Sequence, residues 1–340
     1  MLRLSLSAFL ACFVFGLRPT AALSIPEQDL WGERSKELMR WYERDSSSGS
    51  LRIEDGVYLS WRAFNRKCGD TAVIIIEGRT EFQQKYAELT FDLFKKGLCV
   101  YTYDHRGQGL SSRLVDDHQK SHVEHFSDYT SDLLAFDNAI VRPNHYKRVF
   151  LFGNSMGGLI AAQYASQTTL PISGVILSAP MFDIRTNPLP AFVVHAAAWI
   201  MTKIKRGEKW GWKQVPWDPA RDTFESNRTT SSRRRYDVTL SAFILHPEAA
   251  IGGATWRWIL ESQRATSGAI GLAKSIKAPL LVFQAPRDTF VKPGAQQKFC
   301  SRAASCQLRI APNAKHEIFQ EIDATRNYAM GEMLKFIDAH

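Results

Sequence analysis

The chain lacks the residue patterns of several common protein classes. Its 340 residues include only five cysteines, and no two of them are spaced as C-x-x-C, which argues against a zinc site. The apolar stretch near the N-terminus, residues 4–17, is too short for a comfortable membrane span. The absence of an internal repeat and of a low-complexity tract gives no reason to expect a solenoid or a long disordered segment.

The overall composition is that of a globular protein with a large core. Apolar residues make up 45% of the chain and charged residues 23%. The net charge of +9 favours anionic partners, which include nucleic acid, anionic lipid and the envelope of a Gram-negative cell. No nucleic-acid-binding motif accompanies the charge, so we do not expect nucleic acid as a partner.

The first residues read as an export signal. Arg3 precedes the apolar stretch, and the small residues Thr20, Ala21 and Ala22 follow it. This pattern predicts a signal peptide over residues 1–22 and a periplasmic or secreted protein.

Export would place the remaining cysteines in an oxidising compartment. Cys300 and Cys306 are six residues apart, which favours a local disulfide bond at a helix-to-strand turn. A pair of buried thiols is the alternative. Cys68 and Cys99 have no such local spacing.

Apolar runs and helical patterns alternate along most of the chain. Continuous apolar runs such as TAVIIIEG, RVFLFG and SGVILSAP are typical of strands that are covered on both faces. Their alternation with helices predicts an α/β fold with a mainly parallel sheet and helices on both faces. The rhythm breaks between residues 181 and 271, which predicts a helical cap inserted into a core formed by residues 23–180 and 272–340.

The segment GNSMG, which begins at Gly153, fits the pattern G-x-S-x-G between a predicted strand and a predicted helix. In this context the pattern indicates a nucleophile on a strained turn, with its hydroxyl raised above the sheet edge. A turn built only for close packing is the alternative. We predict that Ser155 is a nucleophile.

A serine nucleophile needs a base and an acid that orients the base. In sheets of this kind, the acid and then the histidine follow the serine along the chain. His316 comes between the last predicted strand and the last helix, and Asp288 follows the strand before it. Asp183 is the competing acid, and we prefer Asp288 because of its position.

An oxyanion needs two N–H donors. The backbone of Met156, next to the nucleophile, supplies one, and the backbone of Arg79, in the loop after the strand TAVIII, supplies the other. Glu77 is unusual in this loop because a carboxylate would oppose the developing charge. We therefore expect its side chain to point away or to pair with Arg79, Arg106 or another cation.

Several longer stretches together resemble a known family. The motifs GNSMGG, EGRTEFQQKYAEL, YDHRGQGLSSR and AKHEIFQE, with residues 224–259, resemble bacterial lysophospholipases of the monoacylglycerol-lipase-like, serine aminopeptidase S33-type α/β-hydrolases. The resemblance runs from Ser50 to Ile337. It implies the α/β-hydrolase fold with a cap, hydrolysis of a lipid carboxylic ester, and no metal or organic cofactor.

The same resemblance implies roles for individual residues. Ser155 matches the nucleophile, Asp288 the acid and His316 the base, while Arg79 and Met156 match the oxyanion donors. Glu77 and Asn154 are departures, because members often have histidine at both positions. Since neither position transfers a proton, substrate or rate is affected more than reaction class.

The substrate and the partners follow less directly. We expect lysophospholipid or monoacylglycerol esters, with a small-ester or thioester hydrolase and an inactive binding protein as alternatives. Four arginines in the predicted cap form a basic patch that could attract phosphate headgroups or an anionic membrane surface, unless it is merely a solvated face. They are Arg228, Arg233, Arg234 and Arg235. The sequence does not indicate an oligomeric state.

Overall fold

A computed structural model describes residues 25–186 and 188–340. The predicted signal peptide lies outside these residues. Within them, eight strands form one sheet. The strands are β1 (Ser47–Glu54), β2 (Val57–Phe64), β3 (Thr71–Ile76), β4 (Cys99–Tyr103), β5 (Arg148–Asn154), β6 (Gly174–Ser178), β7 (Leu280–Gln284) and β8 (Cys306–Ile310).

The spatial order of the strands is β1-β2-β4-β3-β5-β6-β7-β8. The pairs β1–β2 and β2–β4 are antiparallel, and every other neighbouring pair is parallel. The β1–β2 hairpin turns at Asp55 and Gly56, where Gly56 adopts a positive φ of 78° that glycine tolerates without steric penalty. The predicted mainly parallel α/β sheet is therefore confirmed.

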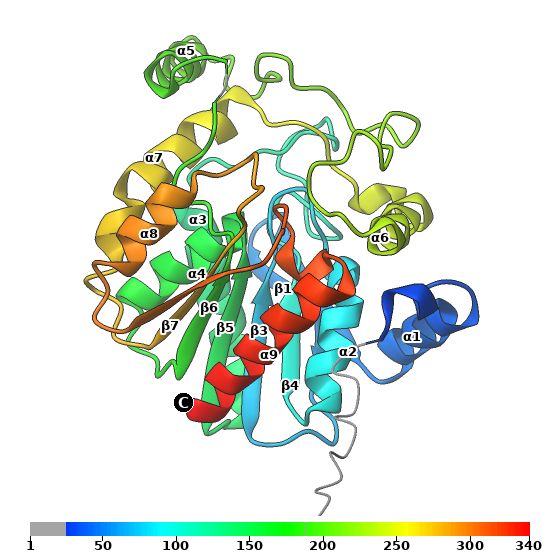
Figure 1. The fold of residues 1–340 in the computed structure, drawn as a ribbon. Coiled ribbons are helices and arrows are strands. Elements are labelled where there is room, and N and C mark those ends of the chain that lie inside the picture. The colour runs from blue at the N-terminus through cyan, green and yellow to red at the C-terminus, as the bar shows by residue number, and fades with distance from the viewer. Residues whose placement is uncertain (1–24, 187) are drawn as a thin grey trace, which may run out of the picture.

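Helices cover both faces of the sheet (Figure 1). On one face, α3, α4, α8 and the C-terminal part of α7 share a buried apolar cluster with the strands. On the other face, α1, α2 and α9 share a second cluster. The helices are α1 (Glu33–Arg44), α2 (Ala87–Lys95), α3 (Ser127–Phe136), α4 (Met156–Gln167), α5 (Ala191–Lys203), α6 (Arg233–Leu245), α7 (Trp256–Leu272), α8 (Pro293–Cys300) and α9 (Asp323–Ala339).

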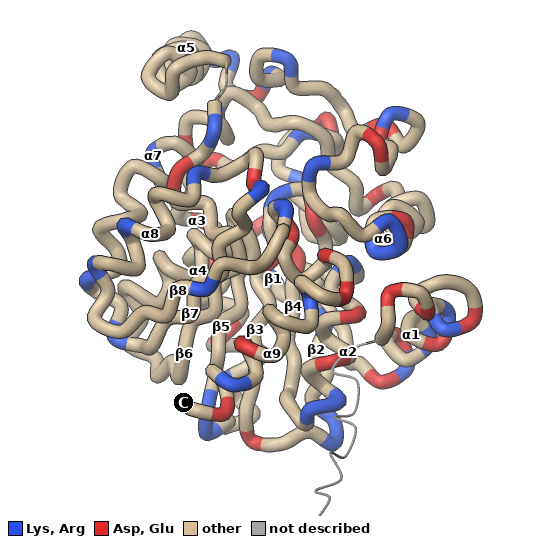
Figure 2. Tube along the Cα trace, in the orientation of Figure 1, with Lys and Arg blue, Asp and Glu red and all other residues tan. Residues whose placement is uncertain are grey.

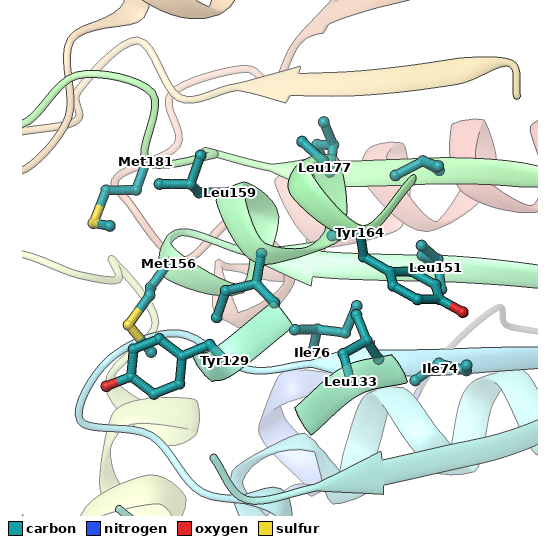
Figure 3. Packing of buried hydrophobic residues seen from close by; sticks show 14 of the residues in the cluster. Ile74, Ile76, Tyr129, Leu133, Leu151, Met156, Leu159, Tyr164, Leu177 and Met181 are labelled. Carbon is teal, nitrogen blue, oxygen red and sulfur yellow. The ribbon is translucent and has the colours of Figure 1, made fainter. Parts of the chain in front are cut away.

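The central strands are buried over their whole length because their apolar runs supply both faces. Figure 3 shows one side of this packing, where Leu151 and Leu177 of the sheet lie near Leu159 and Tyr164 of α4. Met156, the first residue of α4, is also fully buried. The N-terminus of α4 is thus held firmly at the carboxyl edge of β5.

The region predicted as a cap is not built like the rest of the molecule. In Figure 1, α5 and α6 lie beyond the carboxyl edge of the sheet. Helix α7 begins in this region and ends against the core, where Ala269 is fully buried. The cap boundary at residue 271 remains a prediction.

The predicted arginine patch needs a correction. Arg235 is only 1% exposed, and its guanidinium forms ion pairs with Glu88 and Asp323 of the core. It fastens α6 to the core instead of facing a membrane. Arg233 is exposed but pairs with Asp237 one turn along the helix. Figure 2 shows the basic segment at α6, beside acidic positions.

Two disulfide bonds are present among the described residues. One joins Cys300 to Cys306, the pair that the local spacing favours. The other joins Cys68 to Cys99, across 31 residues, and was not predicted. Within residues 25–186 and 188–340, none of the helices combines the length and the hydropathy needed to cross a bilayer.

Candidate active site

Ser155 lies on the tight turn between β5 and α4. Its φ of 51° and ψ of −112° put a non-glycine residue in a strained backbone conformation, as found at functional sites. Glycines permit the turn: a Cβ at Gly153 would lie 2.5 Å from the Gly157 carbonyl oxygen, and one at Gly157 would overlap the carbonyl oxygens of Ile76 and Glu77. The turn therefore raises Ser155 directly beside the loop that follows β3.

His316 and Asp288 are brought together at the carboxyl edge of the sheet. The distance between His316 Nδ1 and Asp288 Oδ2 is 2.7 Å, and both residues are buried. Burial alone would raise the pKa of Asp288, but the hydrogen bond and charge of His316 hold that pKa below its ordinary value, helped by the N–H groups of Phe290 and Val291. A carboxylate of this kind can orient an imidazole.

The competing acid, Asp183, lies elsewhere. Its carboxylate pairs with Lys292 Nζ at 3.0 Å, and it makes no hydrogen bond to His316. Geometry therefore favours Asp288 over Asp183 as the partner of the base.

A cavity of about 650 Å³ collects the predicted residues: Ser155, Asp288, His316 and Arg79 all line it. Among the described residues, none accepts a hydrogen bond from the Ser155 hydroxyl. Such contacts often tighten only when substrate binds. The hydroxyl and the imidazole thus face one space that could hold an ester.

The oxyanion loop is organised by a residue that the sequence reasoning missed. Glu81 Oε2 accepts the Gly78 N–H at 2.5 Å, and Glu81 Oε1 accepts from Lys85 Nζ at 2.9 Å and from Asn154 Nδ2 at 3.1 Å. One buried carboxylate therefore joins the loop after β3 to the residue before the nucleophile. The i,i+4 spacing of Glu81 and Lys85 was the available signal.

The backbone N–H groups of the two predicted oxyanion donors have no hydrogen-bond acceptor among the described residues. Met156 is the first residue of α4, where backbone N–H groups have no partner within the helix. The Arg79 N–H donates to no described residue. Both groups are therefore free to donate to a ligand in the cavity.

Glu77 is completely buried behind this loop. Its Oε1 accepts from Gln108 Nε2 at 2.8 Å and from the His105 N–H at 3.2 Å. Burial raises the pKa of Glu77 well above its ordinary value, and the Asp104 carboxylate adds to the rise. A protonated, neutral Glu77 would not oppose an oxyanion.

Of the two outcomes expected for Glu77, the side chain points away from the cavity and does not pair with a cation. Arg106 pairs with Asp132 at 2.6 Å. The Arg79 guanidinium donates to the Gly252 carbonyl oxygen at 3.2 Å, on the cap side. The donors that contact Glu77 are neutral. Burial, and not a counter-ion, therefore controls the charge of its carboxyl group.

Comparison with known proteins identifies the family to which this chain belongs. The serine aminopeptidase S33 family matches residues 68–323. Lysophospholipase L2 of Escherichia coli K12 is 30% identical over 313 residues, which cover 88% of this chain and 89% of that protein. The chain belongs to the serine aminopeptidase S33 family.

Two further proteins are similar to this chain over most of its length. A monoacylglycerol lipase of Mycolicibacterium smegmatis is 23% identical, over 80% of this chain and 89% of that protein. The crystal structure of a soluble variant of monoglyceride lipase from Saccharomyces cerevisiae superimposes with a TM-score of 0.67 at 20% identity, over 86% of this chain and 94% of that chain. The predicted α/β-hydrolase fold is confirmed.

Proposed function

We propose that this S33-family hydrolase cleaves the carboxylic ester of monoacyl lipids, with lysophospholipids and monoacylglycerols as the substrate class. The lysophospholipase and monoglyceride lipase relatives bear out the predicted reaction class, lipid ester hydrolysis. The observation that carries a serine mechanism is the shared cavity of Ser155 and the His316–Asp288 pair.

In the proposed mechanism, Ser155 Oγ attacks the ester carbonyl while His316 takes its proton. Asp288 fixes the imidazole and stabilises its charged form. The Met156 and Arg79 N–H groups donate to the tetrahedral oxyanion. His316 returns the proton to the leaving alcohol, and water then hydrolyses the acyl-enzyme.

A second cavity supports a long acyl chain as part of the substrate. Its volume is about 570 Å³, and its walls include Trp212, Trp256 and Leu189 of the cap. It shares lining residues with the cavity of Ser155. An apolar chain held there would leave its ester within the first cavity.

We also propose that the protein is exported. The two disulfide bonds support this location, because disulfides persist in oxidising compartments. The predicted signal peptide over residues 1–22 would supply the route.

Labelling with a fluorophosphonate tests the nucleophile. We expect the wild type to be labelled and Ser155→Ala to be unlabelled, while Ser267→Ala, an exposed serine on α7, keeps the label as the matched control. An unlabelled wild type would contradict the serine mechanism.

Hydrolysis of glycerol esters of increasing acyl length tests the substrate class. We expect turnover to rise with chain length until the second cavity is filled. A preference for the shortest chains would favour a small-ester hydrolase instead.

A further inference from the structure

The two cavities meet at a ring of side chains that includes three arginines. The shared lining residues are Arg79, Ile184, Arg185, Arg228, Trp258 and Phe290. Of the three arginines, Arg185 and Arg228 come from separate loops on the cap side, and Arg79 comes from the oxyanion loop. The junction therefore concentrates positive charge beside the expected position of the scissile ester.

None of the three guanidinium groups has a carboxylate partner among the described residues. The Arg79 guanidinium donates to the Gly252 carbonyl oxygen and lies over the face of Trp258, at 5.1 Å from the ring centroid. Burial lowers the pKa of this guanidinium, because a charge out of water is costly unless it is paired. A ligand anion would supply the missing partner.

The other two arginines are exposed but oriented by the site. Arg185 Nε donates to the Val291 carbonyl oxygen at 3.2 Å. The Arg228 guanidinium lies over the Phe290 ring at 4.8 Å. Each of these contacts leaves further N–H donors of the guanidinium unused.

The acidic side chains that line the Ser155 cavity do not neutralise these arginines. Glu81 and Glu317 both pair with Lys85, at 2.9 and 2.6 Å. Asp288 pairs with His316. The cavity therefore has acids with partners and arginines without them, which is the charge pattern of an anion site.

We propose that Arg79, Arg185 and Arg228 form a binding site for the phosphate of a lysophospholipid headgroup. The proposal rests on the proposed function and narrows its substrate class to esters that carry a phosphate close to the scissile bond. Guanidinium groups match phosphate oxygens with paired N–H donors. The site distinguishes a lysophospholipid from a neutral monoacylglycerol of the same acyl chain.

The test compares short-chain, monomeric lysophosphatidylglycerol with the monoacylglycerol of the same chain. The ratio of interest is kcat/KM for the phospholipid divided by kcat/KM for the monoacylglycerol. We expect Arg185→Gln and Arg228→Gln each to lower this ratio about tenfold, mainly by raising KM for the phospholipid. Arg234→Gln removes an equal charge from an exposed site outside the cavity and should leave the ratio at the wild-type value. An unchanged ratio in both cavity variants would overturn the proposal.

Monomeric substrates separate the headgroup from the membrane surface. If the arginine effect appears only with anionic vesicles and is absent with monomers, the arginines act at the surface and the proposed site is wrong.

Binding to Ser155→Ala, followed by calorimetry, separates this site from the mechanism. We expect the phospholipid to bind more tightly than the glyceride, and the added Arg228→Gln change to remove the difference. Equal binding of the two lipids would contradict the headgroup site even if hydrolysis is intact. Wild-type protein that binds selectively but fails to hydrolyse would contradict the proposed function alone.

Discussion

The two walls of the active-site cavity are built in opposite ways. On the sheet wall, Glu81 and Lys85 are almost fully buried and are paired with one another. On the cap wall, Arg185 and Arg228 line the cavity and are exposed. Helix α5 carries a single Lys or Arg and no acid, as its trace in Figure 2 shows. The sheet wall fixes hydrogen-bond donors for chemistry, while the cap wall presents surface for recognition.

This difference assigns separate tasks to the two walls. Groups that must stay in one geometry during a reaction benefit from burial, because electrostatic interactions are stronger away from water. Groups that select a substrate must be reachable, as Arg185 and Arg228 are. Substitutions on the sheet wall should therefore affect stability and rate, whereas cap substitutions should affect substrate preference.

The largest effect is expected at the acid of the sheet wall. Asp288→Asn should lower kcat by about 10⁴-fold, because the amide would favour the wrong tautomer of His316. Asp183→Asn, which removes only the pair with Lys292, is the matched control and should stay near the wild-type rate. Steady-state kinetics on a monoacyl lipid checks both, and the reverse result would make Asp183 the acid.

The next contrast is between a buried ion pair behind the sheet wall and an exposed ion pair of the cap helix α6. Glu81→Gln leaves Lys85 with half of its buried partners and weakens the bond to Gly78 N–H, so we expect a loss of about 3 kcal/mol of unfolding free energy and a lower kcat. Arg233→Gln breaks an exposed pair of α6 and should cost less than about 1 kcal/mol. Urea denaturation measures both, and equal losses would remove the proposed contrast.

Two glycine-to-alanine substitutions, one at the nucleophile turn and one in an open position, test how tightly that turn is packed. Gly157→Ala places a methyl group against the carbonyl oxygens of Ile76 and Glu77, so we expect a loss of about 3 kcal/mol and of fluorophosphonate labelling. Gly268→Ala, in α7 with open space around it, should gain about 0.5–1 kcal/mol. Thermal unfolding and labelling distinguish them, and a stable, fully labelled Gly157→Ala would show that the turn has room.

A smaller effect than the losses expected at Glu81 and Gly157 concerns pH. Burial lowers the pKa of His105 to about 4, below the ordinary value near 6.5. As pH falls below that ordinary value, the unfolded chain binds a proton that the folded protein refuses, so His105 lowers stability by about 2 kcal/mol between about pH 7 and about pH 5. His105→Gln should remove this loss.

Denaturant unfolding of both proteins at the two pH values checks the His105 effect. Asp104, whose pKa burial raises to about 6, titrates in the opposite sense, because its folded form takes up a proton first. Its contribution is common to both proteins and cancels in their difference. Identical pH dependence of wild type and His105→Gln would show that His105 does not titrate as its burial implies.

Much of the sheet wall could be predicted from local patterns. The buried strands β3, β5 and β6 follow from uninterrupted apolar runs, and the turn at Ser155 follows from glycines placed between a strand and a helix. The order of nucleophile, acid and base along the chain pointed to Asp288 and His316. These features depend on near neighbours in the sequence or on a topology that the alternation of elements restricts.

The cap was harder to predict, because its side chains find their partners far away in the sequence. Arg234 and Arg235 are adjacent, yet Arg234 lies over the Trp31 ring while Arg235 is buried against Glu88, 147 residues away. No local pattern separates an anchoring arginine from an exposed one. The Cys68–Cys99 bond was missed for the same reason.

The sequence by itself determined the α/β alternation, the strained turn at Ser155 and the order of the proposed catalytic residues, because backbone sterics and hydrophobic periodicity are local. Only the tertiary structure decided which charges are paired. It gave Glu77 neutral donors instead of a cation and drew Arg235 into the core. It also left Arg79, Arg185 and Arg228 at the cavity without carboxylate partners among the described residues. Charge pairing depends on distance and burial, and folding brings together groups that the chain holds far apart.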